Sequence, residues 1–173
     1  MIKILITGIA VMIGTAVSIY TFNIPTVDNG MISFNNYKGK KILIVNTASE
    51  SAQAPQLAEL QQLYTANQDS LVVIAFPSNS FGNEPRKGAA LKHWKDSLGL
   101  TFPVIDVSDV TGPSGNMLFR WLAHKSYNGI TDAKTVTDFQ KFLIGKTGNI
   151  VGIFDSSVSP IGSHMQTAIH NTN

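Results

Sequence analysis

Two runs of apolar, largely β-branched residues, at 41–46 and 71–76, constrain the fold of this chain more than any other feature. Each run has the continuous apolar pattern of a strand that is buried on both faces of a sheet. Between the runs, Pro55 can occupy the first turn of a helix, and apolar residues then recur at helical spacing from Leu57 towards Asn67. Because a strand, a helix and a strand joined by one crossover pair in parallel, the sequence predicts an α/β core.

The rest of the chain shows the signals of shorter elements. We expect, in chain order, a hairpin with strands at 20–24 and 31–34 around an Asp-Asn-Gly turn, a helix at 86–98, a strand at 101–107, a helix at 116–123, antiparallel strands at 139–144 and 150–154, and a helix over 165–170 capped by Ser163. The two middle helices should pack inward through these residues: Leu91, Trp94, Leu98, Met117, Leu118, Trp121 and Leu122. The antiparallel pair makes the predicted sheet a mixed one.

Length and composition fit a single domain. The chain has 173 residues, of which 43% are apolar and 14% are charged, so it can bury one core. The net charge of +2 is spread along the sequence, and the one close basic cluster, Lys38-Gly39-Lys40-Lys41, is interpreted as a solvated turn before a strand. The charge pattern therefore excludes nucleic acid as a partner.

The first 18 residues differ from the rest. Lys3 is followed by an uncharged apolar run at 4–17, whose length matches the core of a signal peptide. A membrane-spanning helix needs about 20 residues, which the chain reaches only if the segment extends over 4–22. Ala16-Val17-Ser18 offers a small-x-small cleavage site, which favours a signal peptide at 1–18 over an N-terminal membrane anchor, ahead of a domain at 19–173. Both alternatives predict export to the periplasm or cell envelope, with membrane contact only if the segment is not cleaved.

Eight short blocks make residues 20–169 similar to one known family. They are Tyr37-Lys38-Gly39-Lys40, Asn46-Thr47-Ala48-Ser49, Pro55-Gln56, Phe76-Pro77-Ser78-Asn79, Phe81-Gly82, Thr101-Phe102-Pro103-Val104, Phe139-Gln140-Lys141-Phe142-Leu143 and Ser159-Pro160. On these motifs the chain resembles the glutathione peroxidase family. The resemblance implies a thioredoxin-like α/β fold, with a central mixed β-sheet flanked by helices and an N-terminal β-hairpin. It also implies thiol-dependent reduction of hydroperoxides in the response to oxidative stress, a hydroperoxide or thiol ligand and no cofactor, and it names no protein partner.

The resemblance also places the family's catalytic groups on four positions of this sequence. Members use a cysteine or selenocysteine at the tip of the loop after the strand at 41–46, assisted by a glutamine, a tryptophan and an asparagine. The matching residues here are Ser51, Ser80, Thr137 and Asp138, and the position of a resolving cysteine falls nearest to Trp94. The whole chain contains no cysteine. The resemblance therefore implies that the entire catalytic set is replaced.

A serine hydroxyl cannot take the place of sulfur in this chemistry. The attacking group is a thiolate, which is available because a thiol pKa of about 8.5 can be lowered at a helix N-terminus. The field of a helix end does not ionise a hydroxyl, and its oxygen has no counterpart of the sulfenic acid that thiols recycle. We therefore predict a pseudoenzyme that persists as a binding or interaction module, with residual or unconventional peroxidase activity as the alternative.

Other chemistry at this loop has less support. A serine hydrolase centred on Ser51 is a remote alternative, because no base is indicated and no Gly-x-Ser-x-Gly motif is present. Asp138 would acidify the former pocket and repel anionic ligands, whereas Glu50 is expected to face solvent. The histidines lack the spacing of metal ligands and are expected on the solvated surface: His93, His124, His164 and His170.

Overall fold

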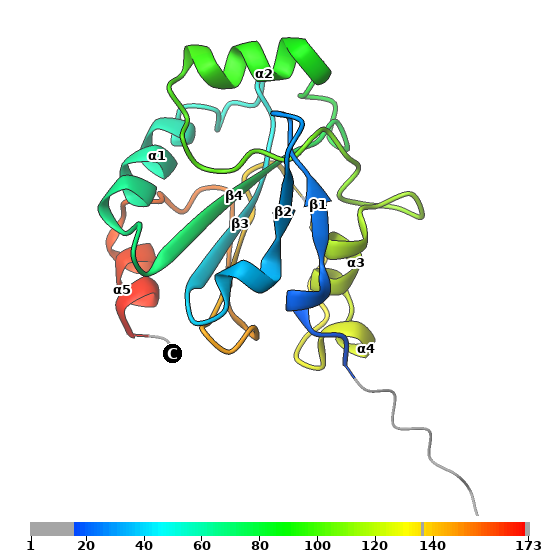
Figure 1. Ribbon diagram of the computed structural model, residues 1–173, viewed down its shortest axis with the longest axis vertical. Coiled ribbons are helices and arrows are strands. Elements are labelled where there is room, and N and C mark those ends of the chain that lie inside the picture. The colour runs from blue at the N-terminus through cyan, green and yellow to red at the C-terminus, as the bar shows by residue number, and fades with distance from the viewer. Residues whose placement is uncertain (1–15, 136, 172–173) are drawn as a thin grey trace, which may run out of the picture.

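A four-stranded mixed sheet forms the centre of the molecule (Figure 1), and its strand order is β4-β3-β5-β6. The computed structural model describes residues 16–135 and 137–171. In the sheet, β3 (Lys41–Thr47) pairs in parallel with β4 (Leu71–Pro77), and it pairs on its other side with the antiparallel β5 (Lys141–Ile144). The last strand, β6 (Ile150–Phe154), is antiparallel to β5. The predicted parallel core and the predicted C-terminal antiparallel pair are therefore both confirmed.

Helices cover both faces of this sheet (Figure 1). They are α1 (Gln56–Ala66), α2 (Gly88–Ser97), α3 (Met117–Ala123), α4 (Lys125–Asn128) and α5 (Ser163–Asn171). Alternate residues of β3 face opposite ways: Leu43 and Val45 pack with α1 and α5, whereas Ile42 and Ile44 pack with α3 and the hairpin. Both sets are fully buried, which is the physical reason for the continuous apolar runs in β3 and β4.

A separate two-stranded hairpin precedes the sheet, as predicted, and its strands are β1 (Asn23–Pro25) and β2 (Met31–Ser33). Single turns of 3-10 helix flank it at Ile19–Thr21 and Phe34–Tyr37. The strand predicted at 101–107 does not form. Only two isolated bridges occur there, between Ala75 and Val104 and between Thr26 and Ile105. Proline at 103 has no N–H to extend a ladder, so pairing along β4 stops after one residue.

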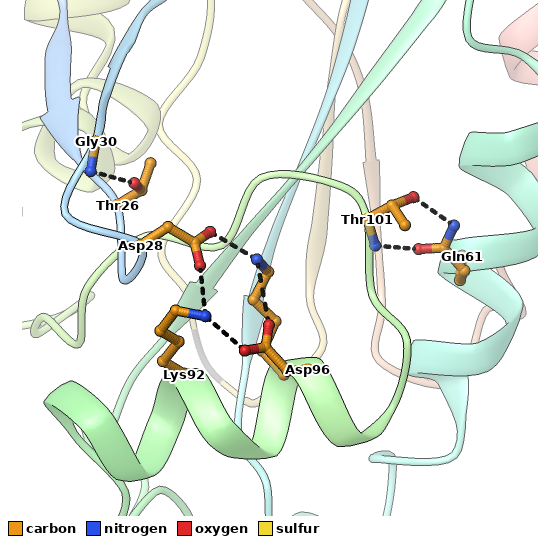
Figure 2. A network of polar contacts seen from close by, with 8 residues as sticks. Thr26, Asp28, Gly30, Gln61, Lys92, Asp96 and Thr101 are labelled. Carbon is orange, nitrogen blue, oxygen red and sulfur yellow. Dashed lines mark hydrogen bonds and ion pairs between the residues drawn. The ribbon is translucent and has the colours of Figure 1, made fainter.

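Two side chains of the predicted inward faces point to solvent instead. Leu98 is 48% exposed because it lies one residue beyond the end of α2, and Met117 is 59% exposed at the first position of α3. On α2, Lys95 is buried in place of Leu98, with Nζ 2.6 Å from the Asp28 carboxylate in the hairpin turn. Figure 2 shows this ion network, in which Lys92 also reaches Asp28. The network holds α2 against the hairpin.

Lys41 is a further correction, because it does not belong to a solvated turn. It is the first residue of β3, its side chain is buried, and its Nζ donates to the main-chain oxygen of Ile169 near the end of α5. Burial lowers the pKa of Lys41, and the nearby charge of Lys146 lowers it further. The C-terminal end of a helix favours a cation, which explains why the strand can begin with a lysine.

The part of the chain that the structure describes holds no helix long and apolar enough to cross a membrane. The predicted signal or anchor falls mostly on residues 1–15, which lie outside the described residues. Within the described ranges there is also no group of three or more histidine or carboxylate side chains arranged to hold a metal ion. All four histidines are exposed, as predicted.

Candidate functional site

Ser51 lies in the loop that leads from the carboxyl end of β3 into α1. Its amide donates to the Ala48 carbonyl at 3.3 Å, and its carbonyl accepts from the Ala54 amide at 2.9 Å. The Ser51 hydroxyl oxygen accepts from the Gln53 amide at 3.3 Å. This serine is half-buried and stabilises the turn that precedes α1, which is an ordinary role for a serine in such a position. A main-chain amide is thus aimed at the hydroxyl oxygen of Ser51.

A buried carboxylate fixes this loop from the side. Glu84 is 2% exposed, and its two oxygens accept from the Ser49 amide at 2.8 Å and from the Ser49 hydroxyl at 2.7 Å. Arg86 contributes its amide to Glu84 at 3.0 Å and donates from its guanidinium to the Ser49 hydroxyl. The same guanidinium lies 3.5 Å from the Glu50 carboxylate and 5.9 Å from the ring centre of Trp94. The loop is therefore joined to the segment before α2.

Asp138 lies near the same loop, in the segment just before β5, which is the neighbour of β3 on the side away from β4. Its side chain is 3% exposed, and Oδ2 accepts from Asn83 Nδ2 at 2.7 Å. Asn83 also accepts the amide of Glu50 at its main-chain oxygen, at 2.9 Å, so it links Asp138 to the loop of Ser51. Oδ1 of Asp138 has no hydrogen-bond partner among the described residues. A buried carboxylate oxygen therefore stands without a donor beside the candidate site.

Thr137 and Phe139 tie this segment to the carboxyl end of β3. The Asn46 side-chain amide donates to the Thr137 carbonyl at 2.9 Å, and the Phe139 amide donates to the Asn46 carbonyl at 2.7 Å. Phe139 has a φ of 61°, in the left-handed region that non-glycine residues rarely adopt. Strained backbone of this kind concentrates at functional sites, where surrounding contacts hold it.

Ser80 and Trp94 are placed differently from Ser51 and Asp138. The Ser80 hydroxyl accepts from the Ser78 hydroxyl at 2.9 Å and from the Val110 amide at 3.0 Å, so it stabilises the loop around Val110. Trp94 is half-buried on α2, and its ring faces the Arg86 guanidinium. Asn83 thus links Asp138 to Glu50, the residue before Ser51, whereas Ser80 belongs to a separate set of hydrogen bonds.

Sequence reasoning missed a buried lysine next to this site. Lys141 is fully buried, and its Nζ donates to the carbonyls of Phe139 at 2.9 Å and Ser156 at 3.3 Å. Burial lowers the pKa of Lys141 to about 8, although the charges of Glu59 and Asp155 oppose the change. The available signal was a lysine at the start of a strand that is otherwise apolar. Glu84 was also missed, because glutamate is usually exposed and the neighbouring sequence gives no sign that this one is buried.

A cavity of about 320 Å³ lies between the loop after Val110 and α3. Its wall includes the apolar side chains of Val110, Phe119 and Ala123, and the basic residues Arg120 and Lys134. An apolar wall with cations at its edge suits a ligand that combines a hydrocarbon part with a negative charge. The implied catalytic residues Ser51, Ser80, Thr137 and Asp138 do not line it.

Comparison with known proteins assigns the chain to a family. The family model described as "Glutathione peroxidase" matches residues 19–123. This chain belongs to the glutathione peroxidase family. The glutathione peroxidase homologue BsaA of Staphylococcus epidermidis is 36% identical over 146 residues, which cover 83% of this chain and 92% of the relative. The hydroperoxy fatty acid reductase of Synechocystis is 33% identical over 153 residues, covering 83% and 89%.

Solved structures confirm the thioredoxin-like fold of this family member. The crystal structure of Trgpx in apo form superposes with a TM-score of 0.67 at 31% identity, covering 91% of this chain and 99% of that chain. A thiol:disulfide interchange protein of the thioredoxin family from Chlorobium tepidum superposes with a TM-score of 0.62 at 18% identity, covering 90% and 97%. The second likeness concerns the fold alone.

Proposed function

We propose that this chain is an exported member of the glutathione peroxidase family that lacks peroxidase activity and acts as a binding or interaction module. The observation that carries the proposal is the state of Ser51: its hydroxyl serves as the acceptor for the Gln53 amide in a chain that contains no cysteine. The family's fold is kept around this loop, while the atom that attacks a peroxide is missing.

The chemistry of peroxide reduction supports this proposal. An amide directed at position 51 could stabilise a thiolate, but it lowers the pKa of a hydroxyl far too little to ionise it near neutral pH. Reduction also requires that the attacking atom accept an oxygen and release it to a thiol. Sulfur does this through sulfenic acid, for which a serine oxygen has no equivalent.

The side chain of Asp138 supports the proposal further. The resemblance implies an asparagine here, whose amide group can donate a hydrogen bond to the reactive atom. An ionised carboxylate can only accept hydrogen bonds.

Two alternatives remain, residual or unconventional peroxidase activity and serine hydrolysis. The first is favoured by the names of the relatives, among them a hydroperoxy fatty acid reductase, which makes an organic hydroperoxide the first ligand to test. The second needs a base for Ser51. Within the described residues, no histidine or carboxylate contacts its hydroxyl, whose hydrogen-bond partner is the Gln53 amide.

Hydroperoxide consumption by the purified full chain tests the proposal. We expect no turnover of hydrogen peroxide or of a fatty acid hydroperoxide with thioredoxin or glutathione as the reductant. Metal-free protein is needed, because a trace metal would decompose peroxide by itself. Turnover that disappears in Ser51→Ala would overturn the proposal, since it would show that the hydroxyl takes part.

Restoring sulfur sharpens the same test. Ser51→Cys should give a single thiol that peroxide oxidises to sulfenic acid, detectable as a gain of one oxygen by mass spectrometry. Steady-state turnover should stay low, because Asp138 and Ser80 do not supply the donors implied by the family. The double variant Ser51→Cys with Asp138→Asn should then oxidise faster than the single one. Efficient cycling by Ser51→Cys alone would contradict our view of these supporting residues.

A further inference from the structure

Exposed apolar side chains gather on one face, formed by α3, α4 and the chain just before the hairpin. Val17, Met117 and Tyr127 are 44%, 59% and 38% exposed and line one shallow hollow together with Phe22 and Trp121. We call this surface the α3–α4 face. Other large exposed apolar residues lie on separate elements: Met31 on β2, Leu98 at the end of α2, Ile153 on β6 and Ile161 before α5.

The chain enters the described domain at this same face. The Val17 amide donates to the Tyr127 carbonyl at 2.8 Å, and the Trp121 indole N–H donates to the Val17 carbonyl at 2.6 Å. Residue 16 therefore lies beside α4, the helix labelled at the lower right of Figure 1. The sequence that comes immediately before it is the uncharged apolar run that begins at residue 4.

The predicted cleavage point lies inside this folded part. Cleavage after Ser18 would remove Val17, which leaves the buried Trp121 indole N–H without its acceptor. It would also remove the Ser18 carbonyl, which accepts from the amide and the hydroxyl of Thr21. These contacts favour the alternative in which the N-terminal segment stays attached as an anchor.

Cationic side chains lie on or near the α3–α4 face: Arg120 lines its hollow, Lys125 is the first residue of α4, and Lys134 follows α4 in the chain. Residues 116–134 contain Arg120, Lys125 and Lys134 but only one acidic residue, Asp132. Within residues 16–135 and 137–171, none of these three cations forms an ion pair with a carboxylate. The Asp132 carboxylate accepts from the Lys125 main-chain amide instead. Exposed apolar side chains next to cations without ion pairs complement a lipid surface, which has an apolar interior and anionic headgroups.

We propose that the α3–α4 face rests on a lipid bilayer with anionic headgroups, held there by the uncleaved N-terminal segment. A bilayer fits better than a second copy of the chain, because a symmetric contact through this face would place the cations of one copy against those of the other. The carboxyl ends of β3 and β4 lie beside α2, at the other end of the long axis from α4 (Figure 1). The loop of Ser51 would then face the aqueous compartment.

The absence of cysteine makes a direct test possible, because one introduced thiol carries one label. The full chain is reconstituted into vesicles of phosphatidylcholine and phosphatidylglycerol that contain a lipid-attached quencher. A fluorophore on Met117→Cys should be quenched severalfold more strongly than the same fluorophore on Leu98→Cys, the matched control, which is similarly exposed but lies on α2. Tyr127→Cys gives an independent label on the same face.

Charge reversal separates docking from anchoring. Arg120→Glu with Lys125→Glu should lower the ratio of docked to free domain, and with it the quenching at position 117, by about fivefold per unit of charge, which is roughly 25-fold for each reversal. The protein should still float with the vesicles. Lys87→Glu, at the exposed start of α2, is the control and should change nothing. The same loss of quenching is expected when phosphatidylglycerol is omitted.

Three results would overturn the proposal. They are equal quenching at positions 117 and 98, failure of the full chain to float with vesicles, and self-quenching of the label at 117 between chains in vesicle-free solution. The last result would identify the α3–α4 face as a contact between copies. Peroxidase assays are not part of this test, so its outcome is independent of the catalytic proposal.

Discussion

At the carboxyl ends of β3 and β4, acidic side chains are buried and hydrogen-bonded, whereas on the α3–α4 face the cationic side chains form no ion pair within the described residues. Glu84 is buried and accepts three hydrogen bonds from Ser49 and Arg86, and Asp138 is held by Asn83. On the α3–α4 face, Lys125 and Lys134 are exposed and form no ion pair within the described residues.

This difference indicates that one end of the molecule contributes mainly to folding, whereas the other is available for interaction. Polar groups that satisfy each other in the interior stabilise one conformation and leave little for a ligand. Polar and apolar groups that have no partner in the same chain are available to a partner outside it. The end of the molecule that holds Ser51 thus has mainly internal contacts, and the end at which the N-terminal segment enters has the free surface. Oδ1 of Asp138, Oδ1 of Asn46, Oε1 of Gln56 and Oγ of Ser108 are the exceptions, since all four are buried without a partner among the described residues.

Removing Glu84 is the largest expected effect and tests the internally satisfied end. Glu84→Ala should lower the free energy of unfolding by about 4 kcal/mol, because the amides of Ser49 and Arg86 lose their acceptor in a buried place. Urea denaturation followed by circular dichroism measures it. The control is Glu50→Ala, which removes the more exposed carboxylate paired with the same arginine and should cost less than about 0.5 kcal/mol. Equal losses would break the comparison, because they would show that burial does not decide the value of these contacts.

Lys141 gives a pH-dependent test of the same end. Its folded pKa of about 8 lies below the ordinary value of 10.5, so the unfolded chain binds the proton more tightly between these two values. Stability should therefore rise from pH 8 to pH 10.5, by up to about 3 kcal/mol, relative to Lys141→Met. Below pH 8 the difference between the two proteins should be constant. Parallel stability curves across the whole range would contradict the buried position of the amine.

Trp121 tests how firmly the chain is joined to the α3–α4 face. Trp121→Phe keeps an aromatic ring but removes the hydrogen bond to the Val17 carbonyl, and it should cost about 1 kcal/mol. Thermal unfolding measured by calorimetry would show it. Trp94→Phe is the matched control, because the Trp94 indole N–H has no hydrogen-bond partner in the described part of the chain. If both substitutions have the same effect, the bond to Val17 contributes nothing and the case for a retained N-terminal segment weakens.

The candidate site was predictable only in part. Ser51 and Asp138 were named from the motifs around them, and the structure joins their segments through Asn83, although their assignment to catalytic positions stays a prediction. The partners of these residues were not predictable. Glu84 reaches Ser49 across 35 positions and Asn83 reaches Asp138 across 55, and a local pattern carries no information about such pairs.

By itself, the sequence determined the central strands and excluded one chemistry. The runs that became β3 and β4 are apolar on both faces, and a chain that must bury both faces of a strand has few arrangements open to it. The lack of cysteine removes thiol chemistry whatever the fold. The tertiary structure decided the burial of Lys41 and Lys141 and the exposure of Met117. It also decided the contact of Val17 with Trp121, 104 positions away. These outcomes depend on which elements pack together, because the free energy of a charge or a hydrogen bond is set by neighbours that are distant in the sequence.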